Sequence, residues 1–155
     1  MKKVLLFMVA AAMSVSVCMA QDDAKAAAKA AKAAAKALKA EIKAANKILR
    51  EAQGILNVPE SGSLSTANDL IQQAMTNVHT QNNPDTWNVA GQIQQKFYMA
   101  EAEKHYLGQA YDTVAFYGSL SNMCDYFIKC DELEQEVFNS TGKAIKYRPA
   151  NKEQV

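Results

Sequence analysis

Glu101, His105 and Asp112 are the side chains whose types and spacing come closest to a chemical site in this sequence. Two of them stand four residues apart, which places a carboxylate and an imidazole on one helix face, where such pairs can bind a metal ion. A zinc site normally needs three or four convergent ligands. Here Gly108 interrupts the helical pattern between His105 and Asp112, and the second histidine, His79, lies in another segment. We therefore expect polar surface residues here and no metal site.

The sequence also lacks the motifs of common catalytic sites. It contains no Gly-rich phosphate loop, no nucleophile elbow, no HExxH helix and no paired-cysteine motif. With only two histidines in 155 residues, acid–base catalysis would rest on carboxylates. We expect a protein that is not an enzyme and that uses no cofactor.

The tyrosines are candidates for a binding surface and not for catalysis, because a Tyr ring gives a large contact area and ends in a hydroxyl group. Four of them stand between residues 98 and 117. They are either a face that binds a protein or peptide partner, or core residues whose hydroxyl groups are satisfied. The predicted partner-binding residues are Tyr98, Tyr106, Tyr111 and Tyr117.

Basic residues at spacings of three and four form a row near the start of the chain. Ammonium groups in such a row can contact the phosphates of lipopolysaccharide, anionic lipid or nucleic acid. The same composition is expected of a solvated face on an alanine-rich helix, and no large apolar or aromatic residue accompanies the first half of the row. The alternative contact residues for an anionic surface are Lys25, Lys29, Lys32, Lys36, Lys39, Lys43, Lys47 and Arg50.

The first 20 residues have the three parts of a cleavable signal peptide. Lys2 and Lys3 are the positive part, residues 4–17 are an uncharged apolar run, and Cys18-Met19-Ala20 precedes the expected cleavage. The run is shorter than the about 20 residues of a spanning helix. An uncleaved anchor and a lipoprotein acylated at Cys18 therefore rank below cleavage. We expect an exported protein, periplasmic, envelope-associated or secreted, with no membrane span after cleavage and no nucleic-acid partner.

Charge is divided unevenly along the rest of the chain. Residues 21–50 carry eight basic and three acidic side chains, whereas residues 51–155 carry seven basic and thirteen acidic ones. This division indicates internal complementarity or a charged segment presented to another molecule. The two cysteines of this part, Cys124 and Cys130, would stand about 9 Å apart along a helix. That separation is too long for a disulfide, so we expect two buried thiols.

Hydrophobic periodicity predicts an all-α fold of antiparallel helical hairpins, as a repeat array or a four-helix bundle. Four helices are expected, over residues 22–53 (stopped by Gly54), 64–78, 84–107 and 109–138. The heptad-like spacing of the first helix leaves a further alternative, in which the protein is a structural coiled-coil subunit of an assembly. The expected division is a signal peptide (1–20), an Ala/Lys-rich amphipathic helix (21–56), a helical domain (57–138) and an irregular segment (139–155).

The expected buried faces follow from the same periodicity. In the first helix, packing is expected from Leu38 to Leu56. Before Leu38 the apolar face of this helix consists mainly of alanine. The other faces are Ala67, Leu70, Ile71, Ala74 and Val78; Trp87, Ala90, Ile93, Phe97 and Ala100; and Phe116, Leu120, Met123, Phe127 and Cys130.

One family resemblance rests on residues 84–135. The predicted third helix opens with Thr86-Trp87-Asn88-Val89-Ala90-Gly91, Leu107-Gly108 is followed by Tyr111, and the fourth helix carries Met123, Phe127 and Cys130. This pattern resembles the tetratricopeptide-repeat (TPR) proteins exported by Bacteroidota, in which the Gly lets a partner helix approach closely. An ordinary helical hairpin with a core Trp would give similar stripes.

The resemblance implies a non-enzymatic scaffold that binds a protein or peptide. Trp87 and Cys130 are 43 residues apart, whereas a 34-residue repeat would put those positions about 23 apart, so one unit with lengthened helices is implied. Because stacked repeats usually need about three units, we expect the N-terminal portion of a longer repeat protein or a truncated relative. Asp112-Thr113-Val114 also resembles the short O-glycosylation motif of that bacterial group, which requires Thr113 to be exposed.

Overall fold

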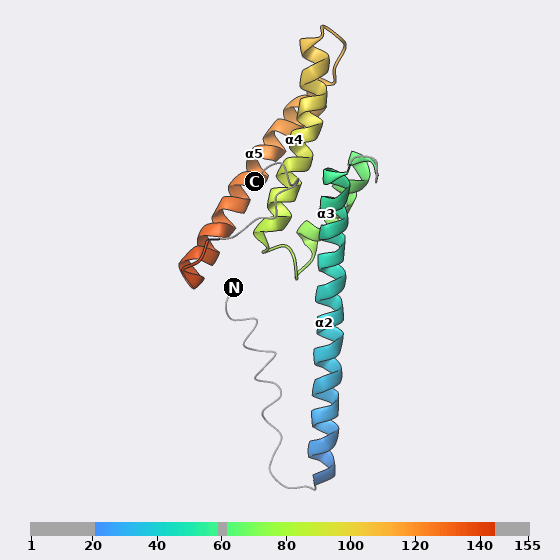
Figure 1. Cartoon of the computed structure of the whole chain (residues 1–155), viewed down its shortest axis with the longest axis vertical. Helices are drawn as coiled ribbons and strands as arrows, with labels where there is room; N and C mark the ends of the chain where they lie inside the picture. Colours follow the sequence, from blue (N-terminus) through green and yellow to red (C-terminus); the bar gives the residue numbers. More distant parts are fainter. Residues whose placement is uncertain (1–20, 59–61, 145–155) are drawn as a thin grey trace. The chain divides into compact units, whose positions relative to one another are not determined.

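A computed structural model describes residues 21–58 and 62–144 of the chain, with side chains from residue 28 onward. The predicted signal peptide with Cys18, and residues 145–155 of the predicted irregular segment, lie outside the described residues. The described part is all-α, without a strand, and this confirms the predicted fold class with its long first helix. None of its helices is long and apolar enough to cross a membrane. The helices are α2 (Gln21–Asn57), α3 (Leu64–Thr76), α4 (Pro84–Tyr106) and α5 (Thr113–Thr141) (Figure 1).

Several helix ends differ from the predicted ones. The helix α2 continues through Gly54 to Asn57, so the expected stop at Gly54 is wrong. The left-handed conformation that favours glycine at a helix end occurs instead at Gly108 and Gly142, each with a φ of 68°. Gly142 therefore ends α5, and the helix reaches Thr141, inside the segment expected to be irregular.

The chain divides into two units, residues 1–38 and 39–155, with the boundary inside α2. In the first unit, every described side chain from residue 28 to residue 38 is exposed. Leu38 itself is 49% exposed, so the prediction that packing begins at this residue is wrong. Alanine side chains bury too little apolar area to hold a helix against a partner without larger neighbours.

The second unit has one hydrophobic core, to which α2, α3 and α4 all contribute. Packing of α2 begins at Ala45, and the alanines in the core let the helices approach closely. Val78, expected in this core, lies beyond the end of α3 and is exposed, because Asn77 is extended and ends the helix. The buried members of the core are Leu49, Ala52, Ala67, Ile71, Ala74, Val89, Ala90 and Ile93.

Buried hydroxyl groups fix the turn between α3 and α4. Thr80 donates its hydroxyl hydrogen to the Ala74 carbonyl at 2.6 Å, and Thr86 donates to the Thr80 carbonyl at 2.9 Å. Trp87 donates from Nε1 to the Gln81 carbonyl at 2.7 Å. Because Thr80 and Thr86 are fully buried, these bonds are shielded from water and set the direction in which α4 leaves the turn.

The helices α4 and α5 form an antiparallel hairpin (Figure 1). They approach closely at Gly91, where a Cβ atom would lie 2.6 Å from Cε1 of Phe127. Trp87 packs edge-on against Tyr126, with ring centroids 5.8 Å apart. Of the residues expected to be buried here, Ala100 is exposed, because the far part of α4 extends beyond the core.

Candidate functional site

The far end of the α4–α5 hairpin, residues 98–117, holds the four predicted tyrosines, and we call it the hairpin end. Phe116 is at the centre of a group of rings: its centroid lies 4.8 Å from that of Tyr98, 5.8 Å from Tyr111 and 5.2 Å from Tyr117. Tyr111 also packs on His105, at 4.7 Å. These edge and tilted contacts are the arrangements that aromatic pairs prefer, so the rings stabilise one another.

The structure divides the four tyrosines into two pairs. Tyr98 and Tyr111 are half-buried within the ring group, which supports the alternative that they are structural, whereas Tyr117 contacts Phe116 from an exposed position. Tyr106 is 89% exposed and Tyr117 is 64% exposed. The neighbouring Met99, Leu107 and Val114 are exposed as well. The hairpin end therefore presents large apolar side chains to solvent on a packed aromatic base.

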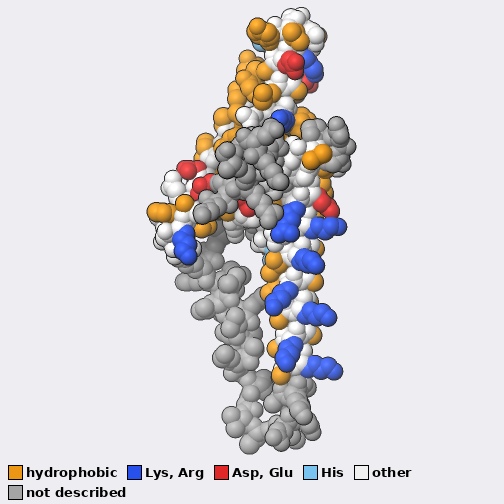
Figure 2. Space-filling model, viewed as in Figure 1, with side chains coloured by type: hydrophobic (Ala, Val, Ile, Leu, Met, Phe, Trp, Pro, Cys, Tyr) orange, Lys and Arg blue, Asp and Glu red, His pale blue; other side chains and the backbone are white. Residues whose placement is uncertain are grey.

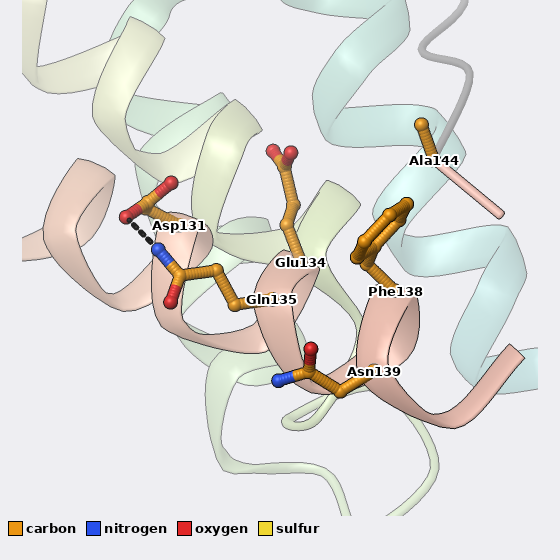
Figure 3. A pocket seen from close by; sticks show the side chains of 6 residues that line it. All are labelled: Asp131, Glu134, Gln135, Phe138, Asn139 and Ala144. Carbon is orange, nitrogen blue, oxygen red and sulfur yellow. Dashed lines mark hydrogen bonds between the residues drawn. The ribbon is translucent and has the colours of Figure 1, made fainter. Parts of the chain in front are cut away.

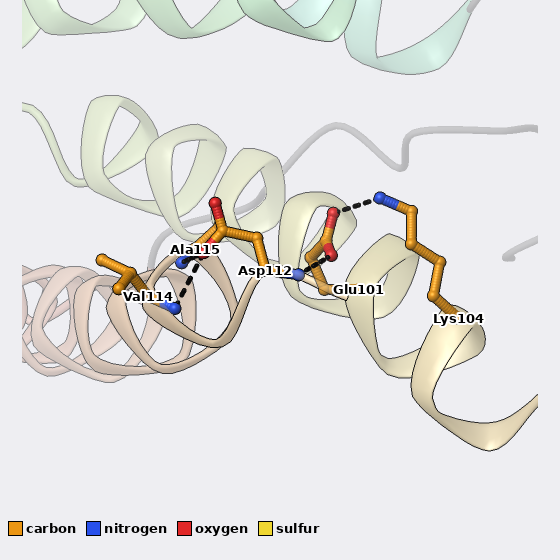
Figure 4. Close-up of polar contacts among 5 residues, drawn as sticks. All are labelled: Glu101, Lys104, Asp112, Val114 and Ala115. Atoms are coloured by element: carbon orange, nitrogen blue, oxygen red, sulfur yellow. Dashed lines mark hydrogen bonds and ion pairs between the residues drawn. The ribbon is translucent and has the colours of Figure 1, made fainter. Parts of the chain in front are cut away.

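A carboxylate holds the connection between α4 and α5 in place (Figure 4). Glu101 accepts a bond from the Lys104 ammonium at 2.5 Å and from the Asp112 backbone N–H at 2.9 Å. Asp112 in turn caps α5 by accepting from the N–H groups of Val114 and Ala115. The Lys104 hydrogen bond and the Asp112 N–H lower the pKa of Glu101, so this carboxylate keeps its charge and both contacts to a lower pH than an isolated glutamate would.

The three residues considered as metal ligands, Glu101, His105 and Asp112, take part in other contacts. The Glu101 carboxylate is bonded to Lys104 and Asp112, while His105 packs its ring on Tyr111. In residues 21–58 and 62–144 there is no group of three or more His, Cys, Asp or Glu side chains that could hold a metal ion.

Thr113 is the first residue of α5 and is exposed. It follows the N-cap Asp112, so it lies at the surface of the hairpin end, as attachment of a glycan would require. Its glycosylation stays a prediction.

The row of basic residues runs along the exposed side of α2 (Figure 2). One of its members, Lys47, is paired with Glu51 at 3.2 Å, an exposed pair of the kind that contributes little to stability. The side chain of Lys25 lies outside the described part. The exposed members are Lys29, Lys32, Lys36, Lys39, Lys43, Lys47 and Arg50.

The two cysteines differ from each other, which corrects the expectation that both are buried. Cys130 is buried, and its thiol contacts the Pro84 carbonyl at 3.5 Å and Oε1 of Glu134 at 3.4 Å. Cys124 is exposed, because the side of α5 that carries it faces away from α4. Cys124 and Cys130 are not bonded to each other, as expected from their spacing on one helix.

Sequence reasoning missed a cavity beside the C-terminal half of α5 (Figure 3). Its volume is about 340 Å³, and it combines acidic, amide and aromatic side chains. Nearby, at the first turn of α4, partial burial and then the charge of Glu134 raise the pKa of Asp85. The residues that line the cavity are Asp131, Glu134, Gln135, Phe138, Asn139 and Ala144.

No protein-family profile, curated protein or solved structure matches this chain.

Proposed function

We propose that this protein is a non-enzymatic helical scaffold of the cell envelope that binds a protein or peptide partner at its hairpin end. The observation that carries the proposal is the exposure of Tyr106 and Leu107 at the end of the hairpin that also holds the packed aromatic rings. Exposed aromatic side chains are typical anchors of protein interfaces, because each of them buries a large contact area on binding. The resemblance to exported TPR proteins implies the same class of function, and the close approach at Gly91 agrees with the role of the motif glycine.

Photo-crosslinking from position 106 tests this proposal. A benzophenone amino acid in place of Tyr106, in cells that export the protein, is expected to give a discrete adduct with an envelope protein. The matched control carries the same group at Gln73, an exposed polar residue of α3. Adducts at neither position, or equal adducts at both, would contradict the proposal, and an adduct of twice the chain mass would identify a second copy instead.

The row of basic residues on α2 supports a second candidate function, attachment to anionic envelope polymers or lipid. Seven exposed cationic side chains share one helix side, and such an array binds phosphates in a salt-dependent manner. The hairpin end is not needed for this function, so the two candidates can be separated by variants.

Replacing Lys32 and Lys36 by glutamine is expected to weaken binding to phosphatidylglycerol vesicles about thirtyfold at low salt, at about 1 kcal/mol per lysine near an anionic surface. The control replaces Lys96 and Lys143, which changes the net charge equally but lies outside the row. Co-sedimentation with the vesicles at rising salt measures the effect. If both double variants bind like the unmodified protein, the row is a solvated helix face only.

A further inference from the structure

The helix α5 carries a second apolar face on the side opposite its buried residues Ser119, Cys130 and Leu133. Along this face, positions alternate at spacings of three and four residues, which is the spacing of a coiled-coil seam. Val114 is 81% exposed, Ile128 59% and Phe138 54%. We call this face the outer seam; all its members are exposed, and they are Val114, Tyr117, Ser121, Cys124, Ile128, Asp131, Gln135 and Phe138.

The outer seam is complementary to itself when two copies run antiparallel. In an antiparallel helix pair each a position faces a d position of the partner, and one register covers the whole seam. That register pairs apolar with apolar or polar with polar residues except at Tyr117, whose ring faces the polar Gln135. The facing pairs are Val114 with Phe138, Tyr117 with Gln135, Ser121 with Asp131, and Cys124 with Ile128.

A parallel pair would be less favourable. It would place the Asp131 carboxylate of one copy against the same carboxylate of the other, inside a contact that excludes water. The antiparallel register instead gives Asp131 the hydroxyl group of Ser121, which can donate a hydrogen bond to it.

The cavity beside α5, which shares Asp131, Gln135 and Phe138 with the outer seam, agrees with the same register. Four of its lining residues, Asp131, Glu134, Gln135 and Phe138, occupy successive d, g, a and d positions, which together form the hole that receives one side chain of a facing helix (Figure 3). The antiparallel register puts Tyr117 of the second copy opposite Gln135. The cavity of about 340 Å³ is large enough for a tyrosine side chain, with Phe138 beside the ring and carboxylates within reach of the hydroxyl group.

We propose that the protein forms a two-fold symmetric dimer through its outer seam, in which Tyr117 of each copy enters the cavity of the other. Such an isologous contact closes on itself and stops at two copies. At the edge of the seam Asp125 and Glu132 add negative charge, which the Lys129–Glu132 ion pair at 2.9 Å offsets in part. Salt should therefore strengthen the dimer. Tyr117 then belongs to the dimer contact, and Tyr106 and Leu107 stay available to a partner.

Cysteine crosslinking tests both the contact and its direction. In the antiparallel register Cys124 faces residue 128 of the second copy. The two Cys124 residues are offset by about 6 Å along the helix axis. Together with the distance between the two helices, this offset is too long for a disulfide. Mild oxidation of the unmodified protein with oxidised glutathione should therefore leave monomers on a non-reducing gel, and so should the variant C124S/I128C alone. An equimolar mixture of the two should give a covalent dimer.

The other possible outcomes of the crosslinking contradict either the register or the dimer itself. A covalent dimer of the unmodified protein, or of C124S/I128C alone, would overturn the antiparallel register. Failure of the mixture to crosslink would overturn the proposal if sedimentation of the unmodified protein also gives the monomer mass at every concentration. If sedimentation instead gives a dimer, the contact lies elsewhere and the outer seam is excluded.

A second measurement separates this contact from the partner site. Tyr117→Ala is expected to raise the dimer dissociation constant at least about tenfold, since truncation of a buried aromatic anchor usually has such an effect. The matched control is Tyr106→Ala, which removes another exposed tyrosine of the hairpin end but lies outside the seam. Equal dissociation constants for both variants would overturn the role of Tyr117, and circular dichroism verifies that each variant is folded.

Discussion

Replacing Gly91 by valine is expected to lower the free energy of unfolding by about 3 kcal/mol, because the new side chain has no room. Even a single Cβ atom would lie 2.6 Å from Cε1 and 2.8 Å from Cδ1 of Phe127. The Phe127 ring belongs to the α4–α5 contact, so relief requires the two helices to separate or the ring to leave its position. Urea unfolding followed by circular dichroism measures the change.

The control for this variant is Gly118→Ala. Gly118 also lies inside a helix, but an added Cβ would meet nothing within 4 Å. This substitution should raise stability by up to about 1 kcal/mol, through helix propensity alone. Combining Gly91→Val with Phe127→Leu should cost less than the sum of the two single changes, since a smaller side chain at 127 makes room. Strict additivity would contradict the proposed clash.

Replacing Ile71 by alanine is expected to lower the free energy of unfolding by about 4 kcal/mol. Ile71 is fully buried and belongs to the core in which α2, α3 and α4 meet, so its loss leaves a cavity that three helices would have to fill. The midpoint of urea unfolding should fall with little change in the slope.

Val78→Ala is the matched control for Ile71→Ala. Val78 is 71% exposed in the turn after α3, so its truncation should change stability by less than about 0.5 kcal/mol. Similar losses for the two variants would mean that the core is not centred on Ile71.

The helices could be predicted from the sequence because their start signals are local. Pro84 at the first position of α4 and the capping residue Asn83 act within one turn, and the periodic apolar residues follow. The ends were less predictable, since Gly54 would suit either a helix end or an exposed helical position. Whether the helix continues through Gly54 depends on whether Ile55 and Leu56 pack against the core, which is a property of the tertiary structure.

The candidate site was predicted only in part. The four tyrosines do gather at one end of the hairpin, but their spacing could not tell Tyr98, which packs on Phe116, from Tyr106, which faces solvent. The difference arises because α4 extends beyond the core, so that only α5 covers its last turns. Glu101 was considered as a metal ligand, and its contact with the Asp112 N–H depends on a turn conformation that composition does not determine.

The outer seam of α5 was overlooked for a similar reason. The stripe from Phe116 to Cys130, which faces α4, was the apolar face expected on this helix, and heptad-like spacing was expected only on the Ala/Lys-rich helix. Two apolar stripes on one helix indicate contacts on two sides. The second stripe became informative only when the structure showed its residues exposed and a cavity at its end.

The exposure of α2 between residues 28 and 44 has a consequence for how the protein melts. A helix that buries almost no surface gains nothing from the cooperative core and adds little to the heat capacity of unfolding. Its helicity depends on alanine and lysine propensity, which weakens gradually on heating. Loss of helix and loss of the core are thus separate processes in one chain: ellipticity declines steadily before the sharp calorimetric transition begins.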